Sequence, residues 1–296
     1  ERIALGHHLS ETVLERIAYD LKNTIFSYIP NTAEVAFYGL VKGMEEYLNK
    51  IKVERILSWG NDFTPDKLEE MVNRKIRQEK IAIKDVKLRT FITEDANRNE
   101  MVQHVYDITY GTVRPNEDTL VVIDDSIVRG TTLKESIVRM LARLNPKKII
   151  VVSSSPQIRY PDCYGIDMAK LEGLVAFQAA MELLKDNNQY GIVDQVYQKC
   201  KAQENYNDDQ VINYVKEIYA PFTDQEISDK IAEMLTPEGT KAEVKIIYQT
   251  VADLHIACPK NLGDWYFTGD YPTDGGNRVV NRAFMNFYEG KDARAY

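Results

Sequence analysis

Cysteine is scarce in this chain, and no cysteines have the spacing of a metal-binding motif. The 296 residues include three scattered cysteines, Cys163, Cys200 and Cys258, and no C-x-x-C pair or His/Cys cluster. Disulfide-dense scaffolds and zinc sites both need grouped cysteines, so neither class is indicated. Few, unpaired cysteines are typical of a reducing compartment, and we expect a cytoplasmic protein.

A basic excess and a long apolar run are also absent. The chain has 37 Lys and Arg against 45 Asp and Glu, a formal net charge of −8. A wide nucleic-acid interface needs a basic face, so we expect no nucleic-acid partner, although a small anion site is still allowed. No apolar run approaches the length that spans a bilayer, and we expect no membrane partner.

The chain alternates apolar runs with helical patterns, which is typical of an α/β protein. TLVVID (119–124) and KKIIVVSSS (147–155) are predicted buried strands. Between them, apolar residues recur at helical spacing: Leu133, Ile137, Met140, Leu141 and Leu144. A strand, a helix and a strand in about thirty residues form a βαβ unit, so the sheet should be parallel.

Elsewhere the patterns are weaker. We expect a helix at 33–49 and a mostly helical region at 169–235, with the capping-box pattern T-x-x-E at Thr223 and Glu226. We expect further strands at TIFSYIP (24–30), IKVERILSW (51–59) and AEVKIIYQTV (242–251).

The segment VVIDDSIVRGTT (121–132) is the main candidate for a ligand-binding site. Ligands of doubly wound sheets bind beyond the carboxyl ends of the strands, where Asp124 and Asp125 are placed. Gly130 permits a turn that brings backbone N–H groups and the following helix N-terminus to an anion. The carboxylates repel a phosphate but suit sugar hydroxyls or Mg2+. A phosphorylated ribose fits both parts of the segment, since its hydroxyls suit the carboxylates and its phosphate suits the turn. The alternative, an ordinary strand followed by a helix N-cap, explains only one of the two acidic residues.

This segment resembles the phosphoribosyl-diphosphate (PRPP) signature of type I phosphoribosyltransferases. The version S-I-V-R-G-T-T is similar to that of the glutamine PRPP amidotransferase (amidophosphoribosyltransferase) family. Further segments resemble the same family in the right order: ERIALGHHLSE (1–11), SYIPNTAEVAF (27–37), RTFI (89–92), SSSPQIRYPDCYGIDM (153–168) and FTGDYPT (267–273).

The resemblance implies a transferase of the glycosyltransferase class, acting in the first step of de novo purine synthesis. Family members transfer the phosphoribosyl group of PRPP to ammonia, release diphosphate and form 5-phosphoribosylamine. We expect this chain to be the transferase portion only, lacking the N-terminal glutaminase domain and ammonia-dependent at best. The implied partners are PRPP, ammonia and the missing glutaminase domain, and the family suggests a homo-oligomer.

The resemblance also implies site residues. Asp124 and Asp125 should hold the ribose hydroxyls and Mg2+. Asn31 and Thr32 should lie near the diphosphate, and Arg89 is a candidate catalytic residue of the mobile loop. The 5-phosphate should be bound by the loop that follows the two carboxylates, which consists of Ser126, Ile127, Val128, Arg129, Gly130, Thr131 and Thr132.

Three departures from the family pattern stand out. Ala33 takes the place of a serine at the diphosphate site. The mobile loop reads I-K-D-V-K-L-R-T-F-I (83–92), and Lys84 or Lys87 is a candidate to supply the positive charge that the loop has lost. Some members bind an iron–sulfur cluster through cysteines, but Gly263 and Tyr266 stand at two of those places, so no cluster is expected.

We therefore predict a type I phosphoribosyltransferase fold, an α/β fold with a mainly parallel sheet flanked by helices. Residues 1–185 form the predicted core, with an inserted hood at about 51–92, and 186–296 a mostly helical C-terminal extension packing on it. Three alternatives stay open: a PRPP-sensing regulatory module, a transferase acting on a nucleobase, and an inactive fragment that awaits its glutaminase half.

Overall fold

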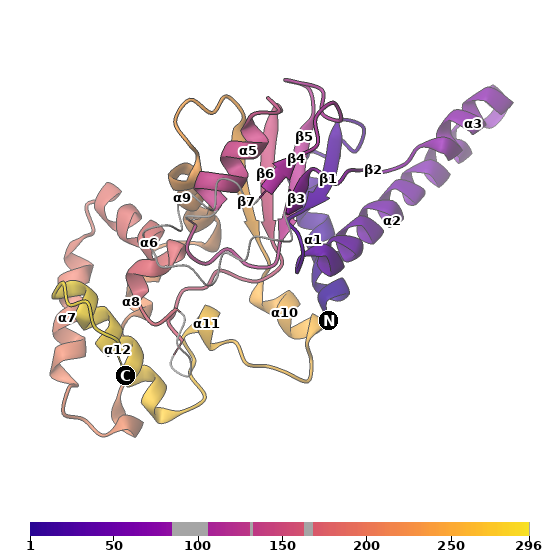
Figure 1. The fold of residues 1–296 in the computed structure, drawn as a ribbon. Coiled ribbons are helices and arrows are strands. Elements are labelled where there is room, and N and C mark those ends of the chain that lie inside the picture. The colour runs from indigo at the N-terminus through magenta and orange to yellow at the C-terminus, as the bar shows by residue number, and fades with distance from the viewer. Residues whose placement is uncertain (85–105, 131–132, 163–167, 296) are drawn as a thin grey trace. The chain divides into compact units, whose positions relative to one another are not determined.

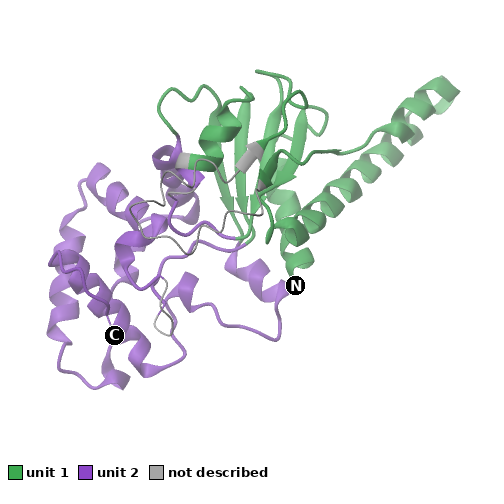
Figure 2. Cartoon of the chain, in the orientation of Figure 1, with its two compact units in different colours: residues 1–125, 135–154, 237–249 green, residues 126–134, 155–236, 250–296 purple. Residues whose placement is uncertain are grey.

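The structure is a computed structural model that describes residues 1–84, 106–130, 133–162 and 168–295 (Figure 1). Arg89, Thr131 and Thr132 therefore lie outside the described residues. The chain forms two compact units (Figure 2). Unit 1 consists of Glu1–Asp125, Glu135–Ser154 and Pro237–Gln249. Unit 2 consists of Ser126–Lys134, Ser155–Thr236 and Thr250–Tyr296.

Unit 1 is built on a five-stranded parallel sheet with the order β2-β1-β5-β6-β7. Its strands are β1 (Thr24–Tyr28), β2 (Arg77–Gln78), β5 (Thr119–Asp124), β6 (Lys148–Ser153) and β7 (Glu243–Tyr248). Strands buried on both faces need near-continuous apolar runs, and β5 and β6 have them. The predicted parallel α/β fold is confirmed.

Two long helices pack together against one face of this sheet (Figure 1). They are α1 (Arg2–Arg16) and α2 (Glu34–Ser58). Their buried aliphatic and aromatic side chains share a core with residues of β1, β5, β6 and β7, including Leu9, Leu40, Phe26, Val121 and Ile150. The helices approach closely because glycines face the opposing backbone: a Cβ built on Gly39 would lie 1.9 Å from the carbonyl oxygen of Ile3.

The predicted strand at 51–59 is wrong, because α2 continues as a helix to Ser58. No proline interrupts this stretch, and its Lys, Glu, Arg and Leu residues favour helix. The helix ends before Gly60, whose φ is +47°. A short helix η1 (Gly60–Asp62) then leads to α3 (Pro65–Asn73), where Thr64 accepts a capping hydrogen bond from the Lys67 N–H at 3.3 Å.

The remaining elements outside the unit 2 helices are short. Strands β3 (Ala82–Lys84) and β4 (Tyr106–Ile108) form a separate antiparallel pair. The helix predicted after β5 is present as a π-helical turn, η2 (Leu133–Val138), that continues as α5 (Arg139–Ala142). It ends before Pro146, as the sequence predicts.

Unit 2 is helical in its described residues, which agrees with the prediction for 169–235. The capping box is confirmed: the Glu226 N–H donates to Thr223 Oγ1 at 3.2 Å, and the Thr223 N–H donates to Glu226 Oε2 at 2.8 Å. No helix in the described parts of the chain is long and apolar enough to cross a membrane. The elements are η3 (Leu171–Gly173), α6 (Val175–Asp186), α7 (Gly191–Ala202), η4 (Asp208–Gln210), α8 (Lys216–Tyr219), α9 (Asp224–Leu235), α10 (Val251–Ala257), α11 (Trp265–Thr268) and α12 (Asp274–Tyr288).

Candidate functional site

The carboxyl ends of the central strands meet at one edge of the sheet in unit 1. The register pairs Tyr28 of β1 with Ile123 of β5, and Asp124 of β5 with Ser153 of β6. The segments that leave these strands therefore start side by side. This is the edge at which parallel sheets bind ligands.

Asp124 and Asp125 are held at this edge by the neighbouring strand end. The Ser154 N–H donates to the Asp124 carbonyl oxygen at 2.9 Å, and Ser154 Oγ donates to the Asp125 carbonyl oxygen at 3.2 Å. The Asp125 N–H donates to Asp124 Oδ1 at 2.8 Å. Asp124 is half-buried and Asp125 is exposed, so a ligand at this edge can reach a carboxylate. Ser154 is a supporting residue that sequence reasoning missed.

Asn31 and Thr32 lie in the loop between β1 and α2, at the same edge. The Ile29 N–H donates to the Ile123 carbonyl oxygen at 2.9 Å, which fixes the start of this loop beside β5. The Pro30–Asn31 peptide bond is cis. Asn31 and Thr32 are exposed, whereas Ala33 is only 1% exposed. The methyl group that replaces the family's serine is therefore packed, and Thr32 supplies the exposed hydroxyl next to it.

A carboxylate in the first turn of α2 is engaged by two tyrosines, which the sequence did not indicate. The hydroxyls of Tyr28 and Tyr38 both donate to Glu34 Oε1 at 3.0 Å. Burial, followed by the hydrogen bond to Glu34, raises the pKa of Tyr28 to about 12. The hydrogen bond from Tyr28 links the end of β1 to the start of the helix that follows Asn31 and Thr32.

The predicted phosphate loop, residues 126–132, is described as far as Gly130 and belongs to unit 2. Gly130 is buried with φ +72°, a conformation that favours glycine, and a Cβ there would lie 2.8 Å from Leu235 Cδ2. The Val128 carbonyl oxygen accepts from the Val175 N–H at 2.8 Å. Ile127 is buried and Arg129 is exposed. The glycine that the sequence singled out thus makes a left-handed turn.

Within the described part of the chain, His7, Cys200 and Arg159 are engaged or buried away from this edge. Among the described residues, no group of three His, Cys, Asp or Glu side chains could hold a metal ion. His7 instead contacts Glu46, with Nε2 and Oε2 2.8 Å apart. Cys200 is buried, and burial raises the pKa of its thiol to about 12. Arg159 is tied to Gln157 and Asp224 inside unit 2, so it braces its own loop.

Comparison with curated proteins places the chain beside one group of enzymes. It is 48% identical over 61 residues to an amidophosphoribosyltransferase of Haemophilus influenzae, a match that covers 21% of this chain and 12% of that protein. It is 33% identical over 100 residues to the amidophosphoribosyltransferase of Schizosaccharomyces pombe, covering 31% and 19%. This chain resembles the amidophosphoribosyltransferases. The resemblance stated from the sequence is therefore confirmed, while no family model matches.

Two solved structures match over a longer stretch with low identity. Glutamine PRPP amidotransferase from B. subtilis, complexed with ADP and GMP, is 21% identical with a TM-score of 0.48, covering 92% of this chain and 42% of that one. A structure described as the allosteric regulatory enzyme of purine biosynthesis is 22% identical with a TM-score of 0.49, covering 92% and 41%. This chain thus spans less than half of the length of these two proteins. Its matches to the two curated enzymes span a fifth or less of the length of those enzymes.

Proposed function

We propose that this chain binds PRPP together with Mg2+ and transfers the phosphoribosyl group to ammonia. The products are diphosphate and 5-phosphoribosylamine, the outcome of the first step of de novo purine synthesis, which we place in the cytoplasm. The observation that carries the proposal is the pair Asp124 and Asp125 at the end of a central parallel strand, beside the loop that opens α2. The likeness to amidophosphoribosyltransferases supports the choice of ammonia as acceptor.

In this proposal the two carboxylates and the loop that follows them bind different parts of the substrate. Asp124 and Asp125 accept hydrogen bonds from the ribose hydroxyls. Ser126 to Thr132 donate backbone and hydroxyl hydrogens to the 5-phosphate, with the left-handed Gly130 turning the chain. Like charges keep the phosphate away from the carboxylates, so the substrate has one orientation.

Asn31 and Thr32 are proposed to face the diphosphate. They are exposed, and they lie directly before α2, whose N-terminus favours an anion. The buried Ala33 cannot contribute a hydroxyl, so we assign that role to Thr32. Arg89, from the segment that resembles the family's mobile loop, is proposed to neutralise charge on the departing diphosphate.

The donor set at this edge fits Mg2+. Mg2+ usually keeps several waters and binds through one or two carboxylates plus substrate phosphates, so a cage of protein ligands is not required. Asp124 and Asp125 are the residues that would hold it. When bound, the ion would neutralise charge on the diphosphate leaving group.

The reaction breaks the bond between ribose C1 and a diphosphate oxygen, and forms a bond between C1 and the ammonia nitrogen. The electron pair of the broken bond leaves with diphosphate, and the nitrogen releases a proton to solvent. The protein contributes by positioning the sugar and stabilising charge, so no acid–base pair is assigned. Removing a carboxylate should therefore weaken substrate binding and slow transfer together.

Calorimetric titration of PRPP with Mg2+ tests the binding half of the proposal. We expect the double substitution Asp124→Asn and Asp125→Asn to weaken binding about a hundredfold or more, since each lost charge-assisted contact is worth about 1.5–3 kcal/mol. Glu45→Gln is the matched control, because Glu45 is an exposed carboxylate on α2 away from the sheet edge. Equal affinity of the double variant and the control would contradict the proposal.

One observation favours a second function, a PRPP-sensing regulatory module. Ala33 is buried where the resemblance places a serine, so the site depends on the neighbouring Thr32 for a hydroxyl near the diphosphate. A sensor would bind PRPP with Mg2+ through Asp124 and Asp125 without releasing diphosphate. An Ala33→Ser variant separates the two functions: restored turnover in an inactive protein would identify the alanine as the cause.

A further inference from the structure

A pocket lies within unit 1, at the end of the sheet opposite to Asp124. Its volume is about 450 Å³. Leu21 and Lys22 precede β1, and Arg77 is the first residue of β2, so the pocket is at the amino ends of the parallel strands. Its other wall comes from α2 and from the end of α3. The proposed PRPP site does not use these residues.

The floor of this pocket is apolar and partly aromatic. The rings of Tyr19 and Tyr47 lie with centroids 5.3 Å apart and planes at 42°. Leu21, Tyr47 and Leu48 are partly buried and pack against the core of the unit, and Ile51 is half-buried beside them. Apolar side chains that stay half-exposed inside a concave site are the usual lining of a small-molecule pocket.

The chain turn that closes the floor has an uncommon conformation. Ala18 and Tyr19 follow α1 with φ values of +52° and +59°, the left-handed region that residues other than glycine rarely adopt. The Tyr19 N–H donates to the Leu14 carbonyl oxygen at 2.8 Å, which holds the turn. This turn places the Tyr19 ring against Tyr47 on α2.

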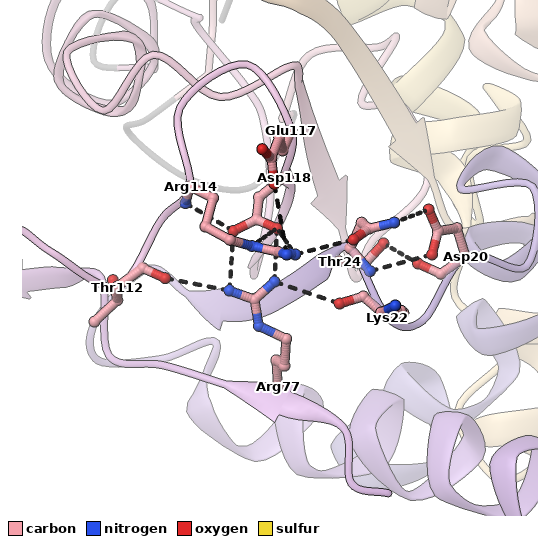
Figure 3. A network of polar contacts seen from close by, with 9 residues as sticks. Asp20, Lys22, Thr24, Arg77, Thr112, Arg114, Glu117 and Asp118 are labelled. Atoms are coloured by element: carbon pink, nitrogen blue, oxygen red, sulfur yellow. Dashed lines mark hydrogen bonds and ion pairs between the residues drawn. The ribbon is translucent and has the colours of Figure 1, made fainter.

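The charged side chains that line the pocket are mostly basic. Four basic side chains, Lys22, Arg74, Lys75 and Arg77, line it together with two acidic ones, Asp20 and Glu70. Arg74 is paired with Glu70 at 3.0 Å, and Arg77 is committed to Asp118 (Figure 3). Within the described part of the chain, the ammonium groups of Lys22 and Lys75 have no ion pair. They are exposed and available to an incoming anionic group.

We propose that this pocket binds a small aromatic anion, with a ring on the tyrosine-lined floor and a phosphate or carboxylate at Lys22 and Lys75. The volume lies within the range of about 300–1,000 Å³ that is typical of ligand pockets. A cation would meet a net basic rim, and a neutral aromatic would leave the lysines unused. The site is distinct from Asp124 and Asp125, which lie at the other end of the strands.

Phenyl phosphate is a suitable probe, because inorganic phosphate and phenol are its two fragments. Titrations of the full chain would be followed by backbone amide chemical shifts, which locate the site, and by calorimetry, which gives its affinity. We expect saturable shifts at residues 19–22 and 74–77. We expect phenyl phosphate to bind about tenfold or more tightly than either fragment, since both halves of the pocket contribute.

Matched variants test the two halves separately. Lys22→Glu and Lys75→Glu should each weaken phenyl phosphate binding about tenfold, whereas Lys50→Glu, an equal charge change on α2 outside the lining, should not. Ile51→Trp fills the floor without a charge change and should abolish binding. Shifts confined to residues 124–130, equal effects of all three lysine reversals, or unchanged binding by Ile51→Trp would each overturn the proposal.

Discussion

Asp118 is the most heavily engaged buried carboxylate that the structure describes in unit 1, and its removal offers a quantitative test (Figure 3). Arg77 Nη1 and Nη2 donate to its two oxygens at 2.6 and 2.9 Å. Arg114 Nε donates at 3.1 Å, and the Arg114 backbone N–H at 2.8 Å. The side chain is 0% exposed and directly precedes β5. The network therefore ties β2 to the start of the strand that ends in Asp124.

The pKa of this carboxyl gives the size of the effect. Burial acts to raise the pKa of Asp118, but the hydrogen bonds from Arg77 and Arg114 outweigh it and lower the pKa from 3.8 to about 2. At 1.36 kcal/mol per pKa unit, the folded state gains about 2.5 kcal/mol from the charged form at neutral pH. Because the folded pKa is depressed, this gain is complete above the unfolded pKa and is lost as pH falls toward 2. About half should remain at pH 3.

We therefore expect Asp118→Asn to lower the free energy of unfolding of unit 1 by about 2–3 kcal/mol at pH 7, and by about half of that at pH 3. Hydrogen exchange of the β5 amides under increasing urea measures this stability. Glu117→Gln is the control: Glu117 is the exposed neighbour, 3.5 Å from Arg114, and should change stability by less than about 0.5 kcal/mol. Equal effects of the two variants, or an effect of Asp118→Asn that is independent of pH, would refute this reasoning.

Two further substitutions test the packing of each unit. Gly39→Ala should destabilise unit 1 by about 1–3 kcal/mol, because its Cβ would meet the backbone of Ile3, while Gly173→Ala, with open space around it, should be neutral in thermal unfolding. Thr223→Ala should destabilise unit 2 by about 1 kcal/mol, since the capping box with Glu226 is lost, and a shift of exchange in α9 would report it. No loss of stability in either variant would contradict the described contacts.

The central strands could be predicted from the sequence, because their apolar pattern matches their burial in the folded protein. TLVVID and KKIIVVSSS each contain four consecutive apolar residues, a pattern typical of a strand buried on both faces, and both form strands. The position of Asp124 at a strand end followed from where that run stops. Gly130 was marked for a turn, and its positive φ bears this out. These features depend on residues adjacent in the chain.

The misplaced strand at 51–59 shows where pattern reasoning fails. Ile51, Val53 and Ile56 gave IKVERILSW a β-branched character, but the segment continues a helix with no proline or glycine between Met44 and Gly60. The β propensity of a few residues is a small preference, whereas extending an existing helix is favourable because the helix is already nucleated.

The supporting contacts of the site could not be predicted, because their partners are distant in the chain. Ser154 reaches the Asp125 carbonyl oxygen across 29 residues of sequence. Arg77 reaches Asp118 across 41 residues. Nothing in either local sequence specifies such a pair. They follow only from the strand order, which places β6 beside β5, and β2 on the other side of β1 from β5.

Release of diphosphate from PRPP and Mg2+, measured with and without ammonium, tests the central claim most directly. The account predicts ammonium-dependent release by the chain, loss of release when Asp124 and Asp125 are both changed to Asn, and retention in Glu45→Gln. A chain that binds PRPP through these carboxylates but never releases diphosphate, even as Ala33→Ser, would contradict the transferase. Release that is unaffected by loss of both carboxylates would contradict the site.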